Sequence, residues 1–173
     1  MATATATKED STTHLLSTRN TIADETRTTV IKTTNNAIAS LIDLQLQTKQ
    51  THWNLRAPQF IAIHEMLDEF YADLDKYVDI LAERITQLGG AAYGTLEAVT
   101  AATTLTKYPS RIHTWDSRVK HLAEVIAISG TQCREAIDTT DEAGDAVTAD
   151  IYTQTSRGLD MWLWKVESHL DSN

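Results

Sequence analysis

Residues 51–84 read THWNLRAPQFIAIHEMLDEFYADLDKYVDILAER, and they carry signals for both the fold class and the chemistry of the chain. Apolar residues recur every three or four positions, which is typical of a helix that buries one face. His64 and Asp68 are four residues apart, as are Asp79 and Glu83, so each pair lies on adjacent turns. At roughly 100° per residue, Asp68, Asp79 and Glu83 lie about 40°, 60° and 100° around the helix axis from His64. The four side chains therefore form one stripe.

This stripe is too long to be a single metal site. His64 and Asp79 are separated by about 22 Å of helix at roughly 1.5 Å per residue, whereas metal–ligand bonds are only about 2 Å long. If the helix packs antiparallel against its own copy, about a two-fold axis near Asp73 and Leu74, the carboxylates of one chain come level with His64 and Asp68 of the other. A two-fold interface is self-complementary, so it would hold two equivalent clusters. Mixed carboxylate and imidazole ligands suit Fe(II), so this geometry predicts an intersubunit iron site.

Several short motifs extend the pattern over most of the chain. They are KQTHWN at 49–54, HEMLD at 64–68, Asp79 followed by AER at 82–84, QLGG at 87–90, KYP at 107–109, TADI at 148–151 and LW at 163–164. Together these motifs resemble the Dps family of mini-ferritins, the DNA-binding proteins from starved cells, which belong to the ferritin-like superfamily. The resemblance covers nearly all of the chain after about residue 15, and the motifs are specific in combination.

The resemblance implies a ferroxidase. Such a protein is a hollow homo-dodecamer that oxidises ferrous iron with hydrogen peroxide, stores the ferric product and protects DNA from oxidative damage. The resemblance also implies a ligand set in which His52, His64 and Asp68 of one subunit meet Asp79 and Glu83 of its two-fold mate. We expect the tighter iron position at His52 and the mate's carboxylates, and the weaker one at His64 and Asp68. Two iron ions held close together would deliver both electrons to peroxide at once and suppress release of hydroxyl radical. Whether peroxide or dioxygen is preferred stays open.

Residues next to the expected ligands have more than one interpretation. Trp53 would shield the site or intercept oxidising radicals, or it would be a packing residue at an interface. Lys49 lies one turn before Trp53 and would pair with a carboxylate such as Asp68, as an outer partner of the site, or it would be an ordinary surface lysine. The stripe has a plain alternative as well, a solvated charged helix face with incidental histidines.

An acidic cluster lies where the last long helix is expected to begin. Its members are Asp141, Glu142, Asp145 and Asp150. Such side chains usually cap a helix N-terminus and compensate its dipole. The resemblance suggests a second role for Glu142, Asp145 and Asp150, the lining of three-fold pores that admit iron. Asp150 lies inside the matching TADI motif and is the firmest of these assignments.

Composition fits a cytoplasmic protein with one folded domain. A chain of 173 residues can bury a substantial core, and no apolar run approaches the ~20 residues that span a bilayer, so we expect no membrane partner. The first residues, MATATATKEDSTTH, have the features of neither a secretory signal nor a transit peptide. The single cysteine, Cys133, fits a reducing compartment. We expect it to be a small core residue rather than a reactive thiol.

The charge of the chain makes direct DNA binding the weaker expectation. The formal net charge is −9, which attracts cations and repels nucleic acid. Among the first 19 residues, only Lys8 and Arg19 are basic, and Glu9 and Asp10 cancel them. Divalent ions that bridge the two polyanions would be needed, and association with the nucleoid stays open.

We expect an all-α, ferritin-like four-helix bundle over residues 21–173, preceded by a flexible tail at 1–20 that is rich in Thr and Ala. Apolar spacing predicts four long helices, over about 22–54, 58–87, 111–138 and 145–170. Pro58 would occupy the first turn of the second helix, and Gly89 and Gly90 would end it. The connection over 88–110 is long, and a short helix at 96–101 avoids a structureless loop of that length. Four helices with one long crossover are typical of ferritin-like bundles.

The position of any iron centre is constrained by an absent motif. The di-iron centre inside an ordinary ferritin bundle uses Glu-x-x-His motifs from two helices, and no glutamate of this chain has a histidine three residues later. This favours a site at a subunit interface. Two other classes of protein remain as alternatives. A nucleoid-compacting DNA binder is disfavoured by the tail charge, and a purely structural bundle predicts no saturable Fe(II) binding.

Overall fold

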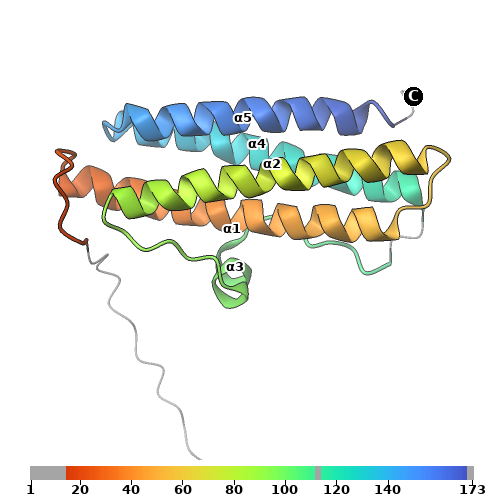
Figure 1. Ribbon diagram of the computed structural model, residues 1–173, viewed down its shortest axis with the longest axis horizontal. Helices are drawn as coiled ribbons and strands as arrows, with labels where there is room; N and C mark the ends of the chain where they lie inside the picture. The colour runs from red at the N-terminus through yellow and green to blue at the C-terminus, as the bar shows by residue number, and fades with distance from the viewer. Residues whose placement is uncertain (1–14, 112–113, 171–173) are drawn as a thin grey trace, which may run out of the picture.

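Four long helices form a bundle in the computed structural model, which describes residues 15–111 and 114–170 (Figure 1). The described helices are α1 (Asp24–Asn54), α2 (Phe60–Gln87), the short α3 (Leu96–Ala102), α4 (Trp115–Glu142) and α5 (Ala146–Glu167). The predicted all-α architecture, with a short extra helix in the long connection, is confirmed. No helix in this described part is both long and apolar enough to cross a membrane.

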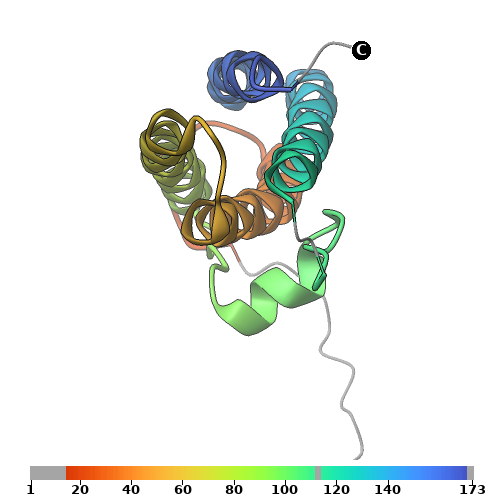
Figure 2. The ribbon, with the colours of Figure 1, turned by 90° about the vertical axis from the view of Figure 1, so that its right-hand side faces the viewer.

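The helices are arranged as two hairpins joined by a crossover. α1 packs against α2, α4 packs against α5, and α1 also packs against α4, whereas α2 and α5 touch only slightly. The connection from α2 to α4 runs back along the bundle, so these two helices point in the same direction (Figure 1). α3 lies outside the bundle and packs on α1 (Figure 2).

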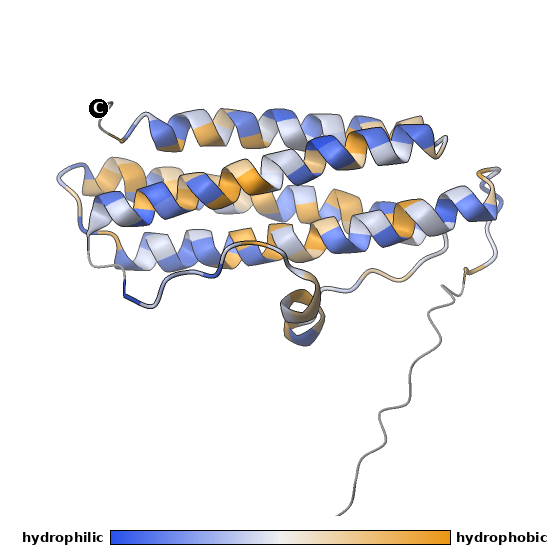
Figure 3. Cartoon of the chain, turned by 180° about the vertical axis from the view of Figure 1, so that it is seen from behind, coloured by the Kyte–Doolittle hydropathy of each residue, from blue (hydrophilic) through white to orange (hydrophobic). Residues whose placement is uncertain are grey.

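Apolar residues on the facing sides of the four long helices form the core. Figure 3 shows apolar and polar residues mixed along each helix, as expected for helices that bury one side. Phe70, Leu74, Tyr152 and Leu159 are fully buried. Cys133 is 1% exposed, which confirms its expected place in the core. Burial raises the pKa of its thiol to about 12, so this cysteine stays protonated.

Glycine ends α2, as the sequence predicted. Gly89 has a φ of 82°, in the left-handed region that glycine adopts without strain. The N–H of Gly89 donates to the carbonyl of Thr86 at 3.0 Å, and the N–H of Gly90 donates to that of Ile85 at 2.9 Å. The carbonyl of Gly89 accepts from the N–H of Leu16 at 2.8 Å. Of the expected tail, residues 15–20 are described, and residues 1–14 lie outside the described part.

The ends of the other helices differ from prediction by a few residues. α2 begins at Phe60, so the placement of Pro58 in its first turn was wrong. Pro58 lies in the preceding turn, which the N–H of Phe60 closes by donating to the carbonyl of Ala57 at 3.1 Å. α1 begins at Asp24 rather than 22, and α5 ends at Glu167 rather than 170.

The predicted third long helix was displaced at both ends, because α4 begins at Trp115 and continues to Glu142. Threonine is only a fair helix former, yet Thr139 and Thr140 remain helical. Their hydroxyls donate to carbonyls of the preceding turn, those of Glu135 at 2.8 Å and Ala136 at 2.7 Å. These bonds accommodate both side chains within the last turns of α4.

Candidate metal centre

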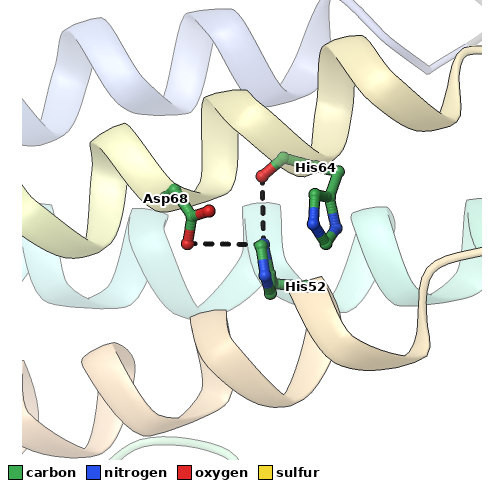
Figure 4. Close-up of side chains that lie close together, drawn as sticks. All are labelled: His52, His64 and Asp68. Carbon is green, nitrogen blue, oxygen red and sulfur yellow. Dashed lines mark hydrogen bonds and ion pairs between the residues drawn. The ribbon is translucent and has the colours of Figure 1, made fainter.

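Three of the five expected ligands come together where α1 ends and α2 begins. His52 lies on α1, and His64 and Asp68 lie one turn apart on α2, with one ligand atom from each residue within 4.8 Å of the others (Figure 4). Antiparallel packing of α1 against α2 produces this meeting, because it places the last turns of one helix beside the first turns of the next. Burial decreases across the cluster, since His52 is buried, His64 is half-buried and Asp68 is exposed. The cluster therefore opens to the surface on its carboxylate side.

The ring of His52 is held in one orientation by a backbone contact. Its Nδ1 donates to the carbonyl oxygen of His64 at 3.0 Å and lies 3.6 Å from Oδ1 of Asp68. A carbonyl oxygen only accepts, so this contact keeps the proton on Nδ1. The lone pair of a neutral His52 is then on Nε2, which is the nitrogen left to bind a metal ion.

His64 completes a stacked pair of imidazoles. Its ring lies on that of His52 with centroids 3.7 Å apart and 21° between the planes, and the ring of Phe60 lies 4.8 Å away. The Nδ1 atom of His64 is buried and has no hydrogen-bond partner among the described residues. Leaving a buried polar nitrogen unpaired costs free energy. A metal ion bound at this nitrogen would remove that cost, so the donor set fits a metal ion.

Asp68 is paired with Lys49, which was one of the two interpretations that the sequence left open for this lysine. The ammonium group of Lys49 donates to Oδ1 of Asp68 and lies 5.0 Å from the centroid of the Tyr71 ring. The hydrogen bond from Lys49 is the main reason that the pKa of Asp68 lies below its ordinary value, and the nearby histidines add to the effect. The carboxylate is therefore ionised near neutral pH, and Lys49 takes up part of its hydrogen-bonding capacity.

Asp79 and Glu83 are not part of this cluster within one subunit. Both are exposed on α2, and they follow His64 by 15 and 19 residues. At roughly 1.5 Å per residue, even the nearer of them lies about 22 Å from His64 along the helix. One subunit thus brings together two imidazoles and one carboxylate, and two further carboxylates lie apart on the same helix.

The remaining predicted residues lie in three kinds of environment. Trp53 is 70% exposed at the end of α1, so the subunit alone does not bury it. Glu142 and Asp150 are exposed, whereas Asp145 is 1% exposed. Asp145 caps α5 by accepting from the N–H of Thr148 at 3.1 Å. The capping interpretation is therefore confirmed for Asp145.

Arg84 is a structural residue that the sequence analysis missed. Its guanidinium donates to both carboxylate oxygens of Asp145, at 2.8 and 2.9 Å, and to the hydroxyl of Thr148 at 2.9 Å. Burial opposes ionisation of Asp145, but hydrogen bonds from Thr148 and Arg84 outweigh it and lower the pKa of Asp145. The two partners are 61 positions apart, so only the fold reveals the pair.

Comparisons with known proteins agree with this fold and with these motifs. Residues 31–172 match the family of ferritin-like domains. The chain is 48% identical over 153 residues to a DNA protection during starvation protein of Agrobacterium fabrum, which covers 88% of this chain and 94% of that protein. A protein of the same name from Brevibacillus brevis is 29% identical over 140 residues, or 79% of this chain and 91% of that one.

Solved structures show the same bundle. DpsC from Streptomyces coelicolor superposes with a TM-score of 0.87 at 27% identity, covering 92% of this chain and 93% of that one. Dps of Mycobacterium smegmatis gives a TM-score of 0.86 at 28% identity, with 92% and 96% covered. The family match, the close relative and the shared bundle together show that this chain belongs to the Dps family of ferritin-like proteins.

Proposed function

We propose that this chain is a ferroxidase that oxidises Fe(II) at sites shared between two subunits and stores the ferric product in a hollow dodecamer. The observation that carries the proposal is the incomplete cluster of His52, His64 and Asp68, which opens to the surface on the helix that also bears the exposed Asp79 and Glu83. Removal of ferrous iron and peroxide would protect DNA in the cytoplasm, in keeping with the name of the Agrobacterium relative.

The positions of the ligands on α2 support a two-fold site. Positions 64 and 83 share their midpoint, between Asp73 and Leu74, with positions 68 and 79. When two copies of α2 pack antiparallel about that point, each pair of positions comes level across the axis. The exposed side of α2 also carries apolar residues, since Ile61 is 61% and Ile80 is 47% exposed. Apolar side chains on such a surface favour packing against another subunit.

The proposed site would bind iron as its substrate. His52 Nε2, the buried nitrogen of His64 and the Asp68 carboxylate would bind from one subunit. Asp79 and Glu83 of the partner subunit would complete the set. Three carboxylates provide negative charge that stabilises Fe(III) more than Fe(II), which favours oxidation. Two ferrous ions supply the two electrons that convert hydrogen peroxide, with two protons, into two water molecules.

Surface acidity would bring iron to the shell. The formal net charge of −9 per chain attracts cations, and the effect increases when subunits assemble. We assign the exposed Glu142 and Asp150 to the entry path at a three-fold pore. The buried Asp145 lies in the turn between these two residues, since Glu142 ends α4 and Asp150 belongs to α5.

Anaerobic titration of the assembled protein with Fe(II), followed by separate peroxide and oxygen challenges, tests the proposal. We expect saturable binding and rapid oxidation by the wild-type protein. His52→Ala and Asp79→Ala should each weaken binding by at least about tenfold, since each removes a metal ligand. Asp138→Ala removes an exposed carboxylate from α4 and should bind iron normally. Absence of saturable Fe(II) binding in the wild-type protein would favour a purely structural bundle.

A mixing experiment tests the shared site directly. In an assembly made only of His52→Ala or only of Asp79→Ala subunits, every site lacks one proposed ligand. When the two variants are unfolded together and reassembled, some sites receive an intact His52 from one subunit and an intact Asp79 from the other. Random pairing should restore about a quarter of the sites, because each side is intact half of the time. No recovery of activity in correctly assembled mixtures would place the site within one subunit.

A further inference from the structure

A polar pocket of about 310 Å³ lies where α1 ends and α4 begins, and none of the three cluster residues lines it, although its Trp53 directly follows His52. This end of the bundle faces the viewer in Figure 2. The pocket is lined by Trp53, Asn54, Arg56, Trp115 and Arg118. Two arginines and two tryptophans thus share one concave surface on a chain that is acidic overall.

Hydrogen-bond donors dominate the lining. Each guanidinium carries five N–H groups and each indole carries one, and none of these groups can accept. No carboxylate is among the lining residues. The side-chain amide of Asn54 donates to the carbonyl of Gln50 at 2.8 Å, so its oxygen is the one acceptor that the lining side chains offer. A surface of this kind is suited to a ligand that has several acceptors and negative charge.

Arg56 has no acidic partner in the described part of the chain. It is exposed and makes neither a hydrogen bond nor an ion pair with any described residue. Other basic residues are paired with acids, as Lys120 is with Asp116 and Arg134 is with Asp160. Among the described residues the cations placed over aromatic rings are Lys49 and Lys165, so Arg56 is not held in that way either. Its charge is therefore available to a bound anion.

Arg118 is oriented by the crossover. Its Nη1 donates to the hydroxyl of Tyr108 at 3.2 Å, and that hydroxyl also accepts from Thr51 at 3.4 Å. This contact fixes the direction of the guanidinium before any ligand arrives, which lowers the entropy cost of binding. Residues 103–120 contain four basic residues and one acidic residue, so the local charge is positive. The basic members are Lys107, Arg111, Arg118 and Lys120.

We propose that this pocket binds a phosphate group, either as inorganic phosphate or as the phosphate of a mononucleotide. Planar guanidinium groups bind phosphate oxygens through paired, charge-assisted hydrogen bonds. The indoles of Trp53 and Trp115 border the same space and would stack on the base of a nucleotide. A divalent cation is the wrong charge for this lining, so the pocket is distinct in chemistry from the His52 cluster.

Isothermal titration calorimetry of the assembled, iron-free protein tests this proposal with inorganic phosphate, adenosine monophosphate and adenosine as probes. We expect saturable binding of both phosphate-bearing probes and much weaker binding of adenosine. Arg56→Gln should weaken phosphate binding by about tenfold or more, because it removes a charge-assisted contact. Arg157→Gln removes the same charge from an exposed position on α5 outside the pocket and should bind phosphate as the wild-type protein does.

The nucleotide probe separates the two sources of phosphate. Tighter binding of adenosine monophosphate than of phosphate, lost in Trp53→Leu, would assign a nucleotide, and equal binding of the two would assign inorganic phosphate. The proposal is overturned by lack of saturable phosphate binding, by an equal loss in Arg157→Gln, or by adenosine binding as tightly as the monophosphate. Iron is absent throughout, so these outcomes are independent of those that test the ferroxidase.

Discussion

Lys49 would compete with the proposed iron for the carboxylate of Asp68. The ammonium group of Lys49 holds Asp68 and lowers its pKa, so the ion pair is present above the ordinary carboxyl range and is lost only as the pH falls through the lowered pKa. Between pH 7.5 and 5.5, therefore, Asp68 stays ionised. A fall in iron affinity over that interval would therefore not come from protonation of Asp68.

Replacing Lys49 by methionine should strengthen iron binding at the weaker position. The change keeps the apolar stem but removes a positive charge that repels the metal ion and engages Asp68. We expect the affinity for Fe(II) to rise by about threefold to tenfold in anaerobic titration. Lys76→Met, which removes the same charge from the pair with Asp73 on α2, is the matched control. Weaker binding by Lys49→Met would instead show that Lys49 positions Asp68 for iron.

At the scale of helices, a buried ion pair joins the end of α2 to the start of α5. The side chains of Arg84 and Asp145 are 7% and 1% exposed. Removing either partner would leave the other charge buried and unpaired, which costs free energy of folding. The pair holds the turn that follows Glu142, and Arg84 is next in sequence to the proposed ligand Glu83. One contact thus connects the proposed iron site to the proposed entry path.

Arg84→Met should lower the free energy of unfolding by about 3–5 kcal/mol, because it leaves the Asp145 carboxylate buried without its charged partner. Arg134→Met breaks a pair whose side chains are 51% and 58% exposed and should cost at most about 1 kcal/mol. Denaturant unfolding at equal protein concentration measures both values, since assembly adds to apparent stability. An equal loss of unfolding free energy in the two variants would show that the buried pair stabilises the fold no more than the exposed pair does.

A second buried contact makes stability depend on pH. His121 is 6% exposed, and its Nε2 donates to Oε1 of Gln47 at 2.7 Å. Gln47 in turn donates to Asp43 at 3.0 Å and to the carbonyl of Thr106 in the crossover at 3.1 Å. Burial is the main cause of the lowered pKa of His121, and the charges of Glu124 and Asp43 oppose it. This histidine is therefore harder to protonate in the folded chain than in the unfolded chain.

Acidification should destabilise the bundle partly through this histidine. An unfolded chain takes up a proton on His121 below about pH 6.5, while the folded chain resists it, so stability falls as the pH decreases. The slope contributed by one such group is at most about 1.4 kcal/mol per pH unit. The melting temperature of His121→Gln should therefore fall less than that of the wild-type protein between pH 7.5 and 5.5. His169→Gln, at the end of α5, should keep the full dependence, and an identical slope in His121→Gln would contradict this account.

Periodicity predicted the helices well and their ends less well. Apolar spacing predicted the four long helices and Gly89 predicted the end of α2, because both signals are local. The C-terminal end of α4 was displaced because Thr139 and Thr140 satisfy their hydroxyls within the helix, which propensity alone does not show. In the site, spacing predicted that His64 and Asp68 share a face. The stacking of His52 on His64, the Arg84–Asp145 pair and the Arg56 pocket depend on packing between distant segments, which no local pattern contains.

At the scale of the whole molecule, charge governs which partners approach. A formal net charge of −9 on each chain repels a polyanion, and the proposed assembly would multiply the repulsion. The basic surface near Arg56 is small beside this excess of acid. The chain should therefore encounter cations readily, whereas long nucleic acids should bind only when divalent cations bridge the two negative charges.

Gel-shift assays should show no retardation of double-stranded DNA by the assembled protein at low salt without divalent ions. Added magnesium should permit retardation, because it can bridge two polyanions, and a rise in monovalent salt should then weaken it. Strong retardation without metal would contradict the charge argument. It would assign direct DNA binding to this chain.

The long crossover between α2 and α4 has a consequence for how the chain acquires its structure. Each hairpin unites helices that are adjacent along the polypeptide, whereas α1 and α4 can meet only after the chain closes over the residues between them, 55–114. The α1–α2 hairpin, which contains His52 and His64, should gain protection early as the chain emerges from the ribosome. Pulsed hydrogen exchange during refolding should show amides of α1 and α2 protected before the crossover, and simultaneous protection would indicate a single concerted step.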